Sequence, residues 1–231
     1  MCGIVGFTGT QQAAPILLEG LKRLEYRGYD SAGIAVQDAD RINTFKSSGL
    51  LENLFKLTDV GASVHGMCGI GHTRWATHGA PTTTNAHPHV SNDGHFAVVH
   101  NGIIENYAEL REELRAKGFI FHSETDTEVI VNLLEMYYDG SLKRTVMKTV
   151  ARLEGSYAIG VVCDECPGEL VAVKNGCPLI LGIGAGENFF ASDVTAIIGH
   201  TRTVIYLEEG DFAHLTPETI TVYDAAGREV H

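Results

Sequence analysis

The feature of this 231-residue sequence that most constrains its fold is a series of nine short apolar runs of strand type. Tight turns join many of them, most clearly across residues 155–223, and they do not alternate one-for-one with helices. Strands that arrive consecutively favour antiparallel sheets over a doubly wound parallel sheet. The runs span residues 3–7, 32–37, 68–73, 96–99, 157–163, 170–173, 179–183, 204–207 and 220–223.

Helical periodicity is clearest at residues 13–23, 107–117 and 128–138, and a fourth helix is expected at 143–153. Two sheets stacked face to face, with these helices outside them, would bury the apolar pattern. A hydrophobic content of 44% over this length supports a real core, and no linker or repeat interrupts the chain. We therefore predict one domain over residues 1–231.

Charge and cysteine content exclude several classes of partner. The formal net charge is −12, without a cluster of basic residues, so we expect neither nucleic acid nor an anionic membrane surface as a partner. The longest apolar runs fall well short of a spanning helix, which takes about 20 residues. An odd count of 5 cysteines argues for reduced thiols, and hence for a cytoplasmic protein.

Cys2 is the first residue that could carry chemistry. Removal of Met1 would give Cys2 a free α-amino group beside its own thiol. The amine titrates at about 7.7–8.0 and the thiol at about 8.5, so near neutral pH the amine can accept the thiol proton at small cost. One residue would then hold both nucleophile and base. The alternative is that Cys2 packs under the first strand as a small apolar residue.

Asn101 and Gly102 lie just beyond the apolar run at 96–99. A side-chain amide and a backbone N–H at a strand end could donate hydrogen bonds to a developing oxyanion in a dry site. The same pair is also typical of an ordinary hairpin turn. The apolar Ile103 and Ile104, and a helix expected to begin near Asn106, follow the pair, which a hairpin does not require.

Two patterns suggest metal chemistry and are better explained otherwise. Cys163 and Cys166 have metal or redox spacing, but a structural zinc site needs four ligands, so we predict a hairpin turn there. A cluster of histidines could belong to a metallohydrolase, but it contains no His-Glu-x-x-His motif and no acidic ligand. We therefore expect no metal and no cofactor. The clustered histidines are His72, His78, His87 and His89.

Six ordered segments resemble a known family. They are CGIVG from Cys2, YRGYDSAG from Tyr26, GHTRWATHG from Gly71, NAHPH from Asn85, HNGIIEN from His100 and SETDTE from Ser123. Together they resemble the class II glutamine amidotransferases and, within them, the glutaminase domains of the glucosamine-6-phosphate synthases. The Tyr-Arg-Gly-Tyr form of the second segment favours those synthases. The likeness extends from Cys2 to about Asp211.

The resemblance implies an α+β fold, namely a four-layer αββα sandwich of two stacked, mainly antiparallel sheets, the N-terminal nucleophile hydrolase fold. It also implies that mature Cys2 attacks the side-chain amide of L-glutamine, releases ammonia and is regenerated by hydrolysis of a thioester. Asn101 and Gly102 would be the oxyanion donors of this reaction.

The resemblance further assigns residues that bind glutamine. Arg74 would hold the α-carboxylate with a bidentate guanidinium, although a surface salt bridge is the usual fate of an arginine. Asp126 would take the α-ammonium group. Residues 125–128 also have the pattern of a capping box, and helix capping alone could explain Asp126.

Further family positions surround these residues. Trp75, Thr77 and His78 match a stretch that closes over bound glutamine, in which Trp75 gates the exit of ammonia. His87 would line the glutamine pocket. Arg27 and Gly28 resemble the pair that supports the nucleophile loop.

The leading hypothesis is thus an enzyme that supplies ammonia for amino-sugar synthesis. In the family, two sugar-isomerase domains follow this one, bind fructose 6-phosphate and use the ammonia, and the full-length enzyme is expected to be a homo-oligomer. The chain would then be an excised domain or one subunit of a split enzyme. The alternatives are a glutaminase domain that serves another acceptor, and a glutamine sensor, which needs Arg74 and Asp126 but no N-terminal thiol.

Overall fold

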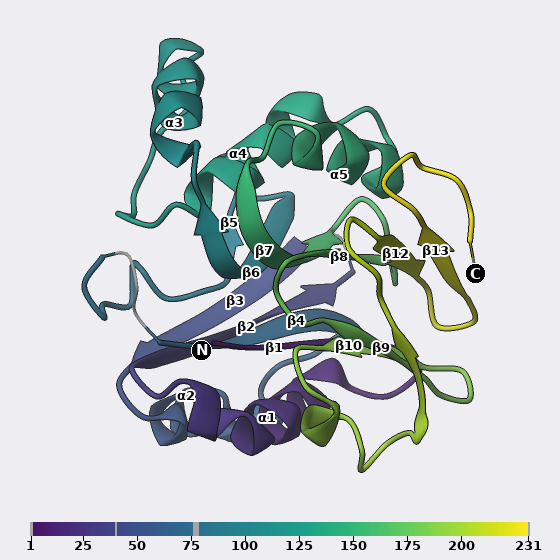
Figure 1. Ribbon diagram of the computed structural model, residues 1–231. Coiled ribbons are helices and arrows are strands. Elements are labelled where there is room, and N and C mark those ends of the chain that lie inside the picture. Colours follow the sequence, from purple (N-terminus) through teal and green to yellow (C-terminus); the bar gives the residue numbers. More distant parts are fainter. Residues whose placement is uncertain (1, 40, 76–78, 231) are drawn as a thin grey trace.

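The computed structural model describes residues 2–39, 41–75 and 79–230. These residues form two antiparallel sheets that lie face to face (Figure 1). The first sheet has the strand order β11 (Thr203–Tyr206), β9 (Ile180–Ile183), β10 (Asn188–Ala191), β1 (Gly3–Thr8), β4 (Cys68–Arg74), β2 (Ser31–Asp38) and β3 (Arg41–Ser48). The second has the order β13 (Ile220–Tyr223), β12 (Phe212–Leu215), β8 (Leu170–Asn175), β7 (Gly155–Cys163), β6 (Phe96–Ile104) and β5 (His89–Val90).

Helices cover the outer faces of both sheets (Figure 1). On the first sheet, α1 (Ala13–Arg23) and α2 (Leu51–Leu57) pack against alternate residues of β1 and β2. On the second sheet, α4 (Glu128–Tyr137) and α5 (Leu142–Val150) pack against β6 and β7, and α3 (Tyr107–Ala116) adds apolar residues to the same core. The predicted four-layer αββα sandwich is confirmed.

Strand β6 shows why this sequence makes four layers. Ala97 and Val99 belong to the core between the sheets, whereas Phe96 and Val98 belong to the core under the helices. Successive side chains of a strand point to opposite faces, so a strand that is apolar at every position must be covered on both sides. Most apolar runs of the sequence are therefore inner strands of a sandwich with helices outside, and the two exceptions, β11 and β13, are edge strands.

All nine predicted strands and all four predicted helices are present, with shifted ends. The sequence analysis missed β3, β5, β10, β12 and α2. Strand β3 is a half-exposed edge strand with the polar sequence RINTFKSS, which carries no apolar alternation to detect. The others are 2 to 7 residues long.

The predicted hairpin turn at Cys163 and Cys166 is confirmed, since β7 ends at Cys163 and β8 begins at Leu170. This β7–β8 turn (residues 164–169) is tied to the opposite sheet. The Gln37 side chain donates to Cys163 O at 2.7 Å and accepts from Gly168 N at 2.8 Å. Thr8 Oγ1 donates to Gly168 O at 2.7 Å.

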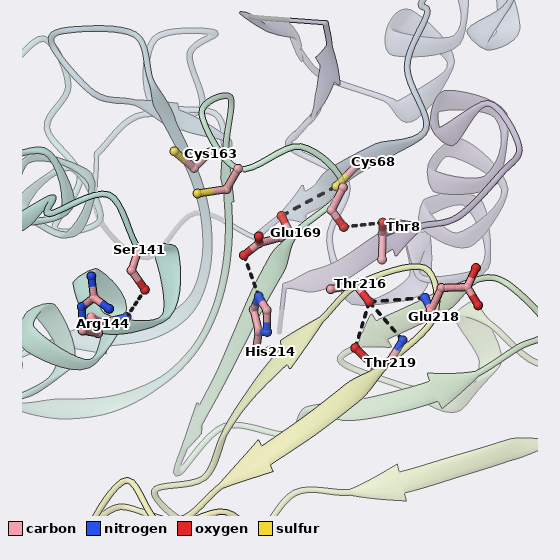
Figure 2. A network of polar contacts seen from close by, with 12 residues as sticks. Thr8, Cys68, Ser141, Arg144, Cys163, Glu169, His214, Thr216, Glu218 and Thr219 are labelled. Carbon is pink, nitrogen blue, oxygen red and sulfur yellow. Dashed lines mark hydrogen bonds and ion pairs between the residues drawn. The ribbon is translucent and has the colours of Figure 1, made fainter.

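Figure 2 shows this region, in which Thr8 and Cys68 of one sheet lie beside Glu169 of the turn. Cys68 Sγ donates to Glu169 O at 3.8 Å, and the Glu169 carboxylate contacts His214 Nε2 at 2.7 Å. The same view contains the start of α5, where Ser141 Oγ accepts from Arg144 N. Among the described residues, no helix has both the length and the apolar character needed to cross a membrane.

Candidate active site

A cavity of about 390 Å³ lies at the end of the strands opposite to the β7–β8 turn. Cys2 directly precedes β1, Arg74 ends β4, and Asn101 lies in β6, so both sheets contribute to it. Of the eleven site residues predicted from the sequence, eight line this cavity. They are Cys2, Arg27, Arg74, Trp75, His87, Asn101, Gly102 and Asp126.

Three predicted site residues do not line the cavity or cannot be placed. Gly28 lies next to the lining residues and is discussed below. Thr77 and His78 lie outside the described residues.

The Cys2 thiol is partly exposed and contacts the backbone of Trp75. Trp75 N donates to Cys2 Sγ at 3.2 Å, and Sγ lies 3.5 Å from Trp75 O. Burial of the sulfur against the cavity wall raises the pKa of the Cys2 thiol. Cys2 is therefore not packed away in the apolar core, and its thiol is protonated at neutral pH unless a base accepts the proton.

Because Gly28 has no side chain, the chain at this residue can lie directly against the backbone of Arg74 and Trp75, which contacts the Cys2 thiol. A Cβ at Gly28 would lie 2.7 Å from Arg74 O and 3.0 Å from Trp75 N. These are backbone atoms that cannot move aside without shifting the end of β4. The neighbouring Arg27 anchors the chain next to Gly28, because its guanidinium donates to Ser192 O and pairs with Asp193 Oδ2 at 3.2 Å.

Arg74 is 3% exposed, so the surface salt bridge considered from the sequence is wrong. Its guanidinium donates to Gly79 O and Ala80 O, both at 3.1 Å. The segment after Ala80 is linked to Glu124, whose carboxylate accepts from Asn85 Nδ2 at 3.0 Å. These contacts connect Arg74 with the segment that carries Asp126.

Asp126 precedes α4 and is held by β6, since its Oδ2 accepts from Ile104 N at 2.8 Å. The predicted capping box is wrong, because α4 begins only at Glu128 and its N-cap residue is Thr127, whose side chain makes no capping hydrogen bond. The Glu128 carboxylate instead accepts from His122 N at 2.8 Å and Ser123 N at 2.7 Å. Asp126 is therefore placed by a loop folded around Glu128.

Asn101 and Gly102 are inner residues of a long strand, so the hairpin alternative is wrong. Strand β6 continues to Ile104, and Gly102 pairs with Tyr157 of β7. Gly102 has φ +115°, and a Cβ there would lie 2.0 Å from Ser156 O, so only glycine fits. The Asn101 Nδ2 donates to Cys2 O at 3.1 Å, which links the two sheets beside Cys2.

Behind these residues lies a histidine cluster, formed by His72, His87, His89 and His100, all of them buried. The rings of His72 and His87 stack at 4.2 Å. Burial lowers the pKa of His72 to about 3 and lowers those of the other three imidazoles as well. The cluster is therefore uncharged at neutral pH. No three His, Cys, Asp or Glu groups in the described part of the chain are arranged to hold a metal ion.

Sequence reasoning missed several lining residues. Thr127 Oγ1 contacts His100 Nδ1 at 2.9 Å and His87 Nε2 at 3.3 Å. Thr127 belongs to the segment SETDTE, which the sequence analysis identified, but its contacts with the two histidines were not predicted. Cys177 also lines the cavity, a second thiol that no motif indicated.

Comparison with known proteins agrees with this geometry. Residues 58–225 match the model of the family described as glutamine amidotransferase domain. The chain is 53% identical over 230 residues to the glutamine–fructose-6-phosphate aminotransferase (isomerizing) of Caldanaerobacter subterraneus subsp. tengcongensis, and 51% identical to that of Aquifex aeolicus. It is matched over its full length but spans only 38% and 39% of these relatives.

A solved structure shares the fold. The glutamine phosphoribosylpyrophosphate amidotransferase from B. subtilis superposes with a TM-score of 0.85 at 27% identity, over 99% of this chain and 50% of that one. The family model covers well over half of the chain, and the stacked sheets are those of a solved amidotransferase. The chain belongs to the glutamine amidotransferase family.

Proposed function

We propose that this chain hydrolyses the side-chain amide of L-glutamine to glutamate and ammonia, with Cys2 as the nucleophile. The observation that carries the proposal is the cavity of about 390 Å³ in which a thiol, a buried arginine, a buried carboxylate and a side-chain amide meet. An α-amino acid has a carboxylate and an ammonium group, and Arg74 and Asp126 have the complementary charges.

The reaction follows from the groups around Cys2. Once Met1 is removed, the α-amino group of Cys2 takes the thiol proton, and Sγ attacks the amide carbon. The C–S bond forms, the C–N bond breaks, and the proton leaves with ammonia. Water then cleaves the thioester, which yields glutamate and restores the thiol.

Asn101 Nδ2 and Gly102 N are the donors that we assign to the oxyanion. Both line the cavity on β6. The Asn101 amide nitrogen donates one N–H to Cys2 O, and its second N–H is assigned to a substrate oxygen. Trp75, Thr77, His78 and His87 complete glutamine binding in this proposal. Arg27 and Gly28 support the backbone around Cys2.

We further propose that the ammonia serves glucosamine 6-phosphate synthesis from fructose 6-phosphate. The support is the activity for which the relatives are named, and this chain spans about two fifths of their length. In this proposal residues 1–231 are one glutaminase domain, and sugar-isomerase domains belong to the rest of a cytoplasmic, homo-oligomeric enzyme. A glutamine sensor is disfavoured because a sensor has no use for Cys2 in the cavity.

Ammonia release and product analysis test this proposal. The chain, with removal of Met1 verified by intact mass, should convert glutamine to equal amounts of glutamate and ammonia. It should make no glucosamine 6-phosphate from glutamine and fructose 6-phosphate. No ammonia from the processed chain would refute the glutaminase, and an amino-sugar product from this chain alone would refute the division between domains.

A glutamine analogue with an electrophile at the amide position tests the assignment of the nucleophile. It should add once, to Cys2, as located by peptide mass. Cys177 provides the matched control, because it is a thiol in the same cavity. The Cys177→Ser variant should be labelled and active like the parent, whereas labelling that disappears with Cys177 would reject Cys2 as the nucleophile.

A further inference from the structure

The orientation of the Asn101 side chain is determined by two contacts on opposite sides of its amide. On one side Nδ2 lies 3.1 Å from Cys2 O, a carbonyl oxygen that can only accept a hydrogen bond. The NH₂ group must therefore face Cys2. On the other side Oδ1 lies 3.0 Å from His72 Nε2. The amide oxygen is thus fixed by His72, a residue of the opposite sheet.

The tautomer of His72 follows from its neighbours. His72 Nε2 lies 3.0 Å from His100 O as well as 3.0 Å from Asn101 Oδ1, and both oxygens are acceptors. Nε2 must therefore carry the proton and donate to both. His72 Nδ1 is buried and has no hydrogen-bond partner within the described residues.

The surroundings keep this imidazole in place and uncharged. His72 is fully buried, and its ring stacks on His87 at an interplanar angle of 16°. His87 is in turn fixed by the backbone N–H of His100, which donates to His87 Nδ1 at 3.3 Å. A rigid neutral imidazole can hold an amide dipole in one direction with little loss of freedom when substrate binds.

We propose that His72 is a positioning residue for the glutaminase reaction, which donates through Nε2 to Asn101 Oδ1 and so keeps Nδ2 turned toward the nucleophile. This inference rests on the proposed function. Without His72 the Asn101 amide loses one of its two anchors and can rotate away from the position where the oxyanion forms. His72 itself touches neither Cys2 nor, in this proposal, the substrate.

Variants at position 72 test the role through the split between kcat and KM. His72→Phe keeps an aromatic ring for the His87 stack but removes the donor, and it should lower kcat with an unchanged KM for glutamine. The loss should approach, and not exceed, the roughly 10²–10³-fold that removal of an oxyanion donor costs. His72→Gln, whose amide nitrogen can take the place of Nε2, should recover most of the activity, whereas His72→Asn, which is too short, should not.

The decisive measurement is a double-mutant cycle with Asn101→Gly. If His72 acts only through Asn101, His72→Phe should have no further effect on kcat in the Asn101→Gly background. Losses that multiply in the double variant would overturn the proposal, as would a wild-type kcat in His72→Phe. If His72→Phe does not fold, the Gln and Asn variants are compared in the same way, and equal activity of these two would count against the donor role.

Two controls separate this inference from its premise. Alkylation of Cys2 by iodoacetamide displaces iodide at an sp³ carbon and forms no oxyanion, so its rate should be the same in His72→Phe and the parent. A slower alkylation would mean that His72 acts on the nucleophile instead. His214→Phe removes an imidazole that contacts Glu169 at the β7–β8 turn and should keep full activity. Absence of glutamine hydrolysis in the parent would reject the proposed function itself.

Discussion

The histidine cluster and the β7–β8 turn both bury polar groups between elements of the two sheets, but they satisfy them differently. In the histidine cluster, His72 Nδ1 and His100 Nε2 have no partner among the described residues. At the β7–β8 turn, the Gln37 amide uses both its nitrogen and its oxygen, and the buried Thr8 hydroxyl donates to Gly168 O.

This difference sets the histidine cluster, which lies beside the cavity, apart from the β7–β8 turn, which joins the two sheets. A buried polar atom without a partner costs free energy, so its retention needs a reason other than folding. A buried amide with all its partners instead joins the two sheets. Changes beside the histidine cluster should therefore lower activity more than melting temperature, and changes at the β7–β8 turn should do the reverse.

The largest expected effect is on the N-terminus. A tag or a retained Met1 turns the α-amino group of Cys2 into an amide, which cannot accept the thiol proton. Turnover should fall by roughly 10²–10⁴-fold, the usual contribution of general base catalysis, with an unchanged melting temperature. Steady-state ammonia release, with the terminus verified by mass, measures the effect. Full turnover of a tagged chain would reject the terminal amine as the base.

Asn101→Gly should have the next largest effect. It removes the amide that we assign to the oxyanion, so kcat should fall by roughly 10²–10³-fold with little change in KM. Glycine accepts the strand conformation, and thermal melting should show only a small loss of stability. A variant with normal kcat and a much lower melting temperature would show that Asn101 stabilises the fold, as the residues of the β7–β8 turn do, and has no role in turnover.

Gln37→Leu is the counterpart at the β7–β8 turn. The leucine fills similar space but leaves Cys163 O and Gly168 N without their partner, which should cost about 1–3 kcal/mol of unfolding free energy. Denaturant unfolding measures this loss, and kcat should stay at the parent value. Gln11→Leu, at an exposed glutamine that contacts Glu187, is the control and should change stability by less than about 0.5 kcal/mol. A fall in kcat in Gln37→Leu would show that the two regions are coupled.

Thr8→Val should have the smallest effect. Valine has nearly the same shape, so the change removes little more than the hydrogen bond to Gly168 O. The expected loss is about 1 kcal/mol, or a fall of about 2–4 °C in the melting temperature for a chain of this size. Differential scanning calorimetry resolves such a shift. An unchanged or higher melting temperature would mean that this link between the sheets adds nothing to stability.

The layers of this fold can be predicted from the sequence because they follow from the apolar pattern within single strands. Strands that are apolar at every position, such as β6, already require cover on both faces. The edge strand β3 escapes detection because its residues are half-exposed and polar. The outcome at Asn101 was open for a different reason. Pairing with β7 decides between strand and hairpin, and the partner Ala158 lies 57 residues away in the chain.

For the site residues, too, contacts between distant parts of the chain could not be predicted from the sequence. Motifs marked Cys2, Arg74 and Asp126, and all three line the cavity. The contact between His72 and Asn101 joins two sheets and has no local signature. His72 lies in one of the family segments, but no role was predicted for it and a metal site was not expected there. The capping box failed because Glu128 binds backbone groups of residues 122 and 123, three and two positions before the residue that the pattern assumes.

The place of β1 inside the first sheet links the chemistry to the order of protein synthesis. Ile4 N donates to Ser192 Oγ across 188 positions of sequence, and Ser192 N donates back to Ile4 O. Ribosomes add about 5–20 residues per second, so β1 waits about 10–40 s for β10, its second neighbour in the sheet. Until then β1 has a neighbour on one side only, β4, and the strand that Cys2 precedes is the edge of an incomplete sheet.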